Sequence, residues 1–292
     1  MLQIDRMEID DAGGNPAKLA LAVLGQIADL KAPVPVREIA TALDIYEIRE
    51  EPLVGLEGGL ITPDDKSEGA ILVNADRPER RKRFTIGHEL GHYLNPWHKP
   101  ASAEGFRCSP KDMAVEAFKV GNRARQMEVE ANEFASELLM PPRLFQVSLN
   151  RRAGIDINHI LSMAEEFDVS REAAARRYVA YADEPVAVIF SKEGAIRYVK
   201  KHPEFPALNI WSGESLPAHS LSLRSSLPIG VVSDWGAVDG DVWLRHARGR
   251  NVCEQTLAQR SGFRLSLVTL EELADDNDEQ DEADWAPPIF RR

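Results

Sequence analysis

Apolar residues recur every three or four positions in several segments of the first 150 residues, and this spacing buries one side of a helix. The segments expected to be helical are 16–30, 36–43, 84–94 and 124–140. The last two end at Pro96 and Pro141, because proline lacks the backbone N–H that a continuing helix needs.

Short runs of β-branched and apolar residues predict a small sheet before the third of these helices. The expected strands are 45–49, 59–62 and 70–73. An exposed strand edge can hold an extended peptide by main-chain hydrogen bonds, and residues 69–74 are the candidate for that edge. The segment 97–120 is expected to be a long connecting loop.

The pattern changes twice beyond residue 150. Residues 155–181 predict two helices joined by a tight turn, with Ser170 as the N-cap of the second, which is helix-turn-helix spacing. From Pro185 onward, alternating apolar runs predict strands instead. These strands are expected at 186–190, 195–199, 230–232, 241–245 and 263–268. The fold class is therefore expected to be α+β.

The most informative motif is His-Glu-x-x-His at positions 88–92 of the third helix. Side chains four residues apart lie on one face of a helix, so His88 and His92 can bind a single tetrahedral zinc ion. Glu89 is rotated by about 100° from His88 and is not a ligand, but it can act as the general base that deprotonates an attacking water. Gly87 and Gly91 each destabilise a helix by about 1 kcal/mol relative to Ala, which indicates close approach by another backbone or a ligand.

A third metal ligand is expected in the fourth helix, where Glu128 and Glu130 compete. Being two residues apart, they point to nearly opposite faces and cannot both reach one ion. Glu128 shares its face with small and apolar residues, as a buried face requires, whereas Glu130 shares its face with further acids. Glu128 is therefore the choice. Asn132, one turn later, is placed to orient a metal-bound imidazole.

These two segments together resemble a known family. Phe84-Thr-Ile-Gly-His-Glu-Leu-Gly-His-Tyr93 and Glu128-Val-Glu-Ala-Asn-Glu-Phe-Ala-Ser-Glu-Leu-Leu-Met-Pro141 are similar to the ImmA/IrrE family of bacterial metallo-endopeptidases, zinc peptidases of the gluzincin type. The resemblance extends over roughly residues 16–145. It implies that His88, His92 and Glu128 bind zinc (Zn2+, with Mn2+ as the alternative) and that Glu89 is the catalytic base. Glu130 also matches a common acid of the family, so the choice between it and Glu128 stays open.

The resemblance also implies a substrate. Family members are cytoplasmic and cleave helix-turn-helix transcriptional repressors, which derepresses mobile-element or stress-response genes. A protein substrate of that class is therefore expected for this chain. Some IrrE-type members carry a GAF-like sensor domain after the peptidase domain, and residues 183–270 are expected, by analogy, to form an α+β domain with a sensory role.

Charge and composition narrow the alternatives. The net charge is −12, and residues 271–292 hold nine acids and two arginines, a composition typical of a disordered tail. An acidic body disfavours direct DNA binding but suits attraction of a basic, DNA-binding substrate. Two cysteines indicate no disulfide framework, and neither a signal peptide nor an apolar run long enough to span a membrane is present, which predicts a cytoplasmic protein.

The expected organisation is a mainly helical, zincin-like peptidase domain at 1–148, a helix-turn-helix-like extension at 149–182, the α+β domain, and the acidic tail. Arg171, Arg176 and Arg177 would be the DNA contacts of the extension. Because residues 151–181 contain five arginines and five acids, a packing or substrate-contact role is favoured over DNA binding. The alternative function is a DNA-binding or sensory transcriptional regulator in which the zinc site is structural or degenerate.

Overall fold

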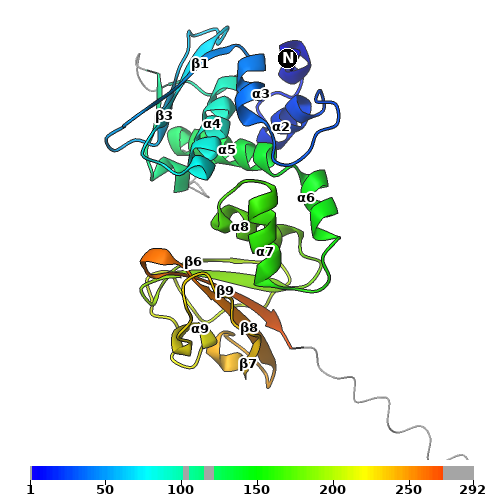
Figure 1. The fold of residues 1–292 in the computed structure, drawn as a ribbon, viewed down its shortest axis with the longest axis vertical. Helices are drawn as coiled ribbons and strands as arrows, with labels where there is room; N and C mark the ends of the chain where they lie inside the picture. Colours follow the sequence, from blue (N-terminus) through cyan, green and yellow to red (C-terminus); the bar gives the residue numbers. More distant parts are fainter. Residues whose placement is uncertain (1, 101–104, 115–121, 272–292) are drawn as a thin grey trace, which may run out of the picture. The chain divides into compact units, whose positions relative to one another are not determined.

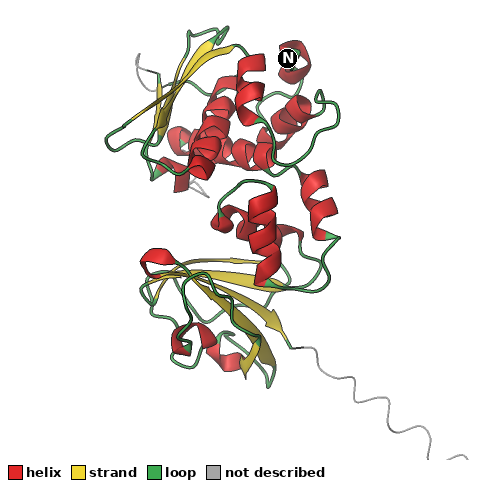
Figure 2. Cartoon of the chain, in the orientation of Figure 1, coloured by secondary structure: helices red, strands yellow, loops and turns green. Residues whose placement is uncertain are grey.

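The computed structural model describes residues 2–100, 105–114 and 122–271. The chain forms two compact units, residues 1–183 and 184–292 (Figure 1). The first unit contains most of the helices and a small sheet, whereas the second is built mainly from strands (Figure 2). The α+β class expected from the sequence is confirmed. None of the helices in the described ranges combines the length and the apolar character needed to cross a membrane.

Helices dominate the first unit. Their bounds are α1 Arg6–Asp10, α2 Pro16–Leu24, α3 Val36–Ala42, α4 Glu79–Leu94, α5 Arg123–Leu139, α6 Pro142–Leu149, α7 Ile157–Glu166 and α8 Arg171–Tyr181, with a 3-10 turn at Asp112–Ala114. The helix expected at 16–30 begins at Pro16, where the Asn15 side chain accepts from the Lys18 N–H. It ends at Gly25, because glycine is a poor helix former, so the last residues of the expected span lie outside the helix.

The sheet of the first unit has the order β1-β3-β2-β4. Its strands are β1 Ile45–Glu51, β2 Gly58–Ile61, β3 Gly69–Asn74 and β4 Phe106–Cys108. The expectation that 69–74 is an edge strand is wrong, since β3 pairs with β1 on one side and β2 on the other. Its unbroken apolar run, Ala70 to Val73, is typical of a strand covered on both faces. The end strands are β1 and β4, and β4 lies inside the segment expected to be a loop.

Helices α4 and α5 pack closely because α4 carries glycines at the contact. A Cβ on Gly91 would lie 3.0 Å from the Cα of Ala131, and one on Gly87 would lie 3.3 Å from the Cβ of Ala135. The close backbone approach expected from these two glycines is therefore present, and the approaching element is α5. This contact fixes the helix that carries Glu128 against the helix that carries the histidines.

The basic run at the start of α4 is paired with acids of the same unit rather than displayed to solvent. Arg80 and Arg83 both bind Asp168, in the turn between α7 and α8. The two residues between them bind acids near the sheet, Arg81 with Glu57 and Lys82 with Glu50. The run therefore ties α4 to the rest of the first unit.

The pair α7 and α8 has the expected helix–turn–helix form. The hydroxyl of Ser170 accepts from the N–H of Ala173 and caps α8, as the sequence indicates. Arg177, one of the candidate DNA contacts, is instead buried and donates two hydrogen bonds to the carboxylate of Glu137 and one to the carbonyl of Met140. Its role is to attach α8 to α5.

The second unit contains an antiparallel sheet of order β6-β5-β9-β8-β7. The strands are β5 Val186–Lys192, β6 Ala195–Lys201, β7 Gly236–Asp239, β8 Asn251–Ala258 and β9 Phe263–Leu270. A short helix, α9 Leu221–Arg224, and 3-10 turns at Gly240–Val242 and Arg260–Gly262 accompany them. This arrangement is compatible with the expected α+β domain, whereas the expected acidic tail, beyond residue 271, lies outside the described residues.

Two of the strands expected in the second unit are wrong. At 230–232 only Val232 pairs, in an isolated bridge with Leu257. The segment 241–245 begins in a 3-10 turn, and its alternation reflects Trp243 and Leu244 entering the core beneath the sheet. Aromatic and β-branched residues favour a strand prediction wherever they are buried, including in segments whose backbone pairs with no strand. This is why 230–232 and 241–245 were expected to be strands.

Candidate metal centre

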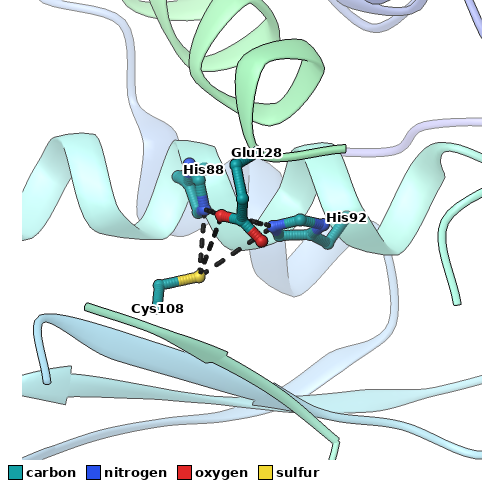
Figure 3. A group of neighbouring side chains, drawn as sticks. All are labelled: His88, His92, Cys108 and Glu128. Carbon is teal, nitrogen blue, oxygen red and sulfur yellow. Dashed lines mark hydrogen bonds and ion pairs between the residues drawn. The ribbon is translucent and has the colours of Figure 1, made fainter. Parts of the chain in front are cut away.

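Four side chains from three elements converge on one point in the first unit (Figure 3). His88 and His92 come from α4, Glu128 from the first turns of α5, and Cys108 from the end of β4. Their ligand atoms all lie within 4.8 Å of one another. Both imidazoles are fully buried, and the carboxylate of Glu128 is largely so.

The separations between these atoms scatter, from 3.0 to 3.9 Å, around those of a tetrahedral ion. The Nε2 atom of His88 lies 3.1 Å from Nε2 of His92, 3.0 Å from Sγ of Cys108 and 3.2 Å from Oε2 of Glu128. The remaining three separations are 3.5 Å between His92 and Glu128 and 3.9 Å from Sγ to each of these two groups. Bonds of about 2.0–2.3 Å around a tetrahedral zinc place its ligand atoms about 3.3–3.7 Å apart. The cluster could therefore hold one metal ion.

The orientation of His88 leaves a lone pair directed at this point. The side-chain amide of Asn132 donates to the carbonyl of Asp112, at 3.0 Å, so its oxygen faces His88. That oxygen lies 2.9 Å from Nδ1 of His88, and this nitrogen must therefore carry the proton. Nε2 is then free to bind a cation. Asn132 occupies the position that orients a metal-binding imidazole.

His92 is oriented in the same sense by a longer chain. Oε2 of Glu130 accepts from Nε2 of His98 at 2.8 Å, so Nδ1 of His98 is an acceptor. It receives the proton on Nδ1 of His92, 3.0 Å away, which again leaves Nε2 of His92 as a lone pair. The Nε2 lone pairs of His88 and His92 are then 3.1 Å apart and lie beside an oxygen of Glu128. These groups repel one another unless a positive charge lies among them.

The two acids that compete in the sequence have different places in the structure. Glu128 lies at the cluster, whereas Glu130 faces away from it and binds His98, Asn95 and Gln126. The geometry thus places Glu128 among the candidate ligands and gives Glu130 a supporting position behind His92. Sequence reasoning missed this position because it depends on His98, which lies in the loop that follows α4.

Glu89 is buried beside the cluster, with the Cys108 thiol near its carboxylate but beyond hydrogen-bond distance. Its side chain is 0% exposed, and neither carboxylate oxygen has a hydrogen-bond partner within the described residues. Burial raises the pKa of Glu89 to about 7, although the charge of His88 and the nearby Cys108 thiol act in the opposite direction. Glu89 is thus a buried carboxylate without a hydrogen-bond partner among the described residues, next to the candidate ligands.

The electrostatics of the cluster favour a cation. Burial lowers the pKa of His92 to about 3, so its imidazole is neutral and able to bind a metal ion. For His88, burial alone lowers the pKa, but the hydrogen bond to Glu128 and the charges of Glu89 and Glu128 outweigh it and raise this pKa. Without an ion, a proton on Nε2 of His88 supplies the positive charge at this point, and a metal ion would replace that proton. Burial also raises the pKa of Cys108 well above its usual range, and only a bound metal ion would deprotonate that thiol readily.

Sequence reasoning missed Cys108 and His98. Cys108 lies in a three-residue strand, which is too short for its alternating pattern to be recognised. The pattern is visible once the structure is known, because Phe106 and Cys108 point inward and Arg107 points outward. His98 follows a proline-containing turn and has no partner at ligand spacing in the sequence, so only the fold brings it to His92.

Donor set, buried carboxylate and fold together define a domain of the metallopeptidase type. Residues 47–178 match the model of the peptidase M78 family, described as the IrrE N-terminal-like domain. The chain therefore carries an IrrE-like peptidase domain, and its resemblance to the ImmA/IrrE family is confirmed.

The other comparisons concern the fold. A solved structure described as a Mycobacterium tuberculosis transcriptional regulator is similar with a TM-score of 0.56 and 11% sequence identity, over 88% of each chain. At this identity the likeness shows a shared fold. No curated protein sequence matches the chain.

Proposed function

We propose that this protein is a zinc-dependent metallo-endopeptidase that hydrolyses a peptide bond in a helix-turn-helix transcriptional repressor. His88, His92 and Glu128 would hold the ion, and Glu89 would be the catalytic base. Three protein ligands of this kind are typical of catalytic zinc sites.

One observation carries the proposal: Glu89 is buried without a hydrogen-bond partner among the described residues. Burying a polar group in this state destabilises a fold by about 1–3 kcal/mol, and more for a charged one. A site that only stabilised the fold would have no use for such a carboxylate. A hydrolase needs one, because a base must receive the proton of the attacking water and pass it to the leaving amine.

The surroundings supply the rest of the chemistry. When bound, zinc polarises the scissile carbonyl and makes water a stronger nucleophile. Asn132 and His98 hold the two imidazoles in the tautomer that can bind the ion. β4 is an end strand of the sheet and stacks Phe106 on His92, with ring centroids 4.6 Å apart. An extended peptide that paired with β4 would therefore pass beside the cluster.

The substrate class rests on the family and on charge. The net charge of −12 favours encounter with basic proteins, and DNA-binding repressors are basic. The pairing of Arg80, Arg83 and Arg177 with acids of the same unit lowers the positive charge available for DNA. A repressor protein is therefore a better partner than its operator DNA.

One observation favours the alternative, a sensory or DNA-binding regulator with a structural zinc site. Cys108 adds a fourth protein donor to the cluster, and structural zinc sites are closed by four protein ligands. The alternative predicts that wild type and Glu89→Gln both bind a promoter duplex in a gel-shift assay, more weakly as the salt concentration rises. It also predicts that neither protein cleaves a repressor.

The test is cleavage of a helix-turn-helix repressor, chosen from those encoded near the gene for this chain. The zinc-loaded full chain is incubated with that repressor, and the products are followed by gel and intact mass. Wild type should release two fragments of defined mass, Glu89→Gln should release none, and both should contain equal zinc. Glu133→Gln, the same chemical change on an exposed position of α5, should cleave like wild type. Cleavage by Glu89→Gln at the wild-type rate would exclude the proposed base.

A further inference from the structure

We propose that Cys108 is a fourth protein ligand that closes the metal site and holds most of the resting protein in a low-activity form. This inference rests on the peptidase function proposed above and concerns the state of the same site before it acts. Opening the site requires that the sulfur leave the ion.

The sulfur atom of Cys108 lies against the two imidazoles and the carboxylate of Glu128. Sγ lies 3.0 Å from Nε2 of His88 and 3.9 Å from both Nε2 of His92 and Oε2 of Glu128. A buried cysteine that served only as a small apolar residue would contact carbon atoms instead. Here the thiol faces three other donor atoms, each of which binds zinc in proteins.

The backbone of β4 holds this cysteine in place. Cys108 pairs with Gly58, and its carbonyl accepts from the N–H of Glu57 at 2.8 Å. There is no room for a side chain at the next residue of β2, since a Cβ on Gly59 would lie 2.7 Å from the carbonyl oxygen of Phe106. Strand β2 thus needs glycine to let β4 approach. The pairing of β4 with β2 therefore fixes the position of the sulfur atom.

Both inward side chains of β4 cover the metal-binding histidines. Phe106 stacks on His92, and Cys108 contacts His88. Because catalytic zinc sites keep one position for water or substrate, a thiolate in the fourth position excludes both. The lack of a hydrogen-bond partner for Glu89 among the described residues agrees with such a site. The water that would bind this carboxylate is excluded while sulfur occupies the fourth position.

The first measurement uses cobalt as a spectroscopic substitute for zinc in the full chain. A thiolate ligand gives cobalt(II) a charge-transfer absorption in the near ultraviolet. Wild type and Cys253→Ala should show this band, and Cys108→Ala should not. Cys253 is the matched control, because it is the other cysteine of the chain and lies on β8 in the second unit. A wild-type protein that binds cobalt without the band overturns the proposal.

The second measurement asks whether the site is closed. Acetohydroxamate, a small bidentate metal ligand, is titrated into the cobalt-loaded proteins, and the visible spectrum is followed. It should bind Cys108→Ala at least about tenfold more tightly than wild type, a difference of about 1.4 kcal/mol. Equal affinity for the two proteins would show an open wild-type site and overturn the proposal.

A third measurement needs no substitution and so does not depend on the folding of a variant. Zinc X-ray absorption of the unaltered protein should show one sulfur at about 2.3 Å beside nitrogen and oxygen at about 2.0–2.2 Å. A shell of nitrogen and oxygen alone overturns the assignment.

Activity then tests the low-activity state. With the same repressor, Cys108→Ala should cleave at least about tenfold faster than wild type, and Cys253→Ala should match wild type. If Cys108→Ala is no faster, the low-activity state is overturned even where sulfur is a ligand. The spectroscopic tests involve no cleavage, so an open, sulfur-free site would leave the peptidase proposal intact.

Discussion

Two glutamates that are 0% exposed, one in each unit, have opposite surroundings. Glu254 in β8 is 0% exposed, and its carboxylate accepts from the N–H groups of Leu221 and Ser222 and from Nε1 of Trp243. Glu89 in α4 is equally buried, but no donor within the described residues reaches its oxygens. Glu254 thus fixes α9 and Trp243 to the sheet, whereas Glu89 fixes nothing.

The contrast separates a buried carboxylate that stabilises the fold from one that, under the proposed function, is held for catalysis. A carboxylate with three donors is compensated for its loss of water, and removing it leaves those donors unpaired. A carboxylate without donors destabilises the fold and persists only where another requirement holds it. In the first unit we propose that this requirement is catalysis at the neighbouring candidate metal centre.

The largest expected effect is on catalysis. Glu89→Gln should lower the initial rate of repressor cleavage by a factor on the order of 10² to 10⁴, because a positioned base contributes that much to proton transfer. Glu254→Gln should leave the rate unchanged at temperatures where the second unit is folded. The measurement is the initial cleavage rate of each variant at matched zinc content. Equal losses of rate in Glu89→Gln and Glu254→Gln would contradict a catalytic role specific to Glu89.

The next effect is on stability. Glu254→Met should reduce the free energy of unfolding by about 3 kcal/mol or more, since it leaves buried N–H groups of Leu221, Ser222 and Trp243 without an acceptor. Urea denaturation of the full chain, followed by tryptophan fluorescence, measures the change. A loss below about 1 kcal/mol would mean that the hydrogen bonds of Glu254 contribute little.

A smaller effect is expected from the residues that orient the imidazoles. Asn132→Ala should weaken zinc binding by about 10- to 100-fold, because Nδ1 of His88 loses the oxygen that fixes its proton. Competition with a chelator of known affinity measures the change, with Glu133→Ala on the exposed side of α5 as the control. Unchanged affinity would remove Asn132 from the site.

The smallest effect is a gain. In the metal-free protein, Glu89→Met should raise the free energy of unfolding by about 1–2 kcal/mol, because an apolar side chain replaces an unpaired carboxylate. The gain should depend on pH. Burial raises the pKa of Glu89 to about 7 from 4.5, so its unfavourable contribution appears as pH rises above 4.5 and is complete above 7. Unfolding at pH 5 and pH 8 measures it, and a gain larger at pH 5 would contradict this explanation.

The sequence allowed much of this site to be predicted, because helices carry it. His88, Glu89 and His92 are fixed by a five-residue motif, and the small, apolar face of α5 distinguishes Glu128 from Glu130. The structure brings the two histidines, Glu128 and Asn132 together in that arrangement. Helical periodicity is a strong local signal, so both the elements and the faces of their side chains could be inferred from it.

The parts that the sequence did not reveal depend on strand pairing and on loops. Cys108 reaches the cluster only because β4 adds to β2, which is a contact between segments some 50 residues apart. His98 reaches His92 through the turn that follows α4. In the second unit, β8 was not expected, and the buried Trp243 gave the segment 241–245 the alternating pattern of a strand. Non-local pairing leaves little trace in a short window of sequence.

The most direct test of the central claim is the zinc content of the purified full chain and two variants. We expect about one zinc per chain in wild type and in Glu130→Gln, and almost none in Glu128→Ala, because of these two acids Glu128 has the oxygen at the paired imidazoles. Wild-type protein without stoichiometric zinc, or Glu128→Ala that retains it while Glu130→Gln does not, would contradict the account.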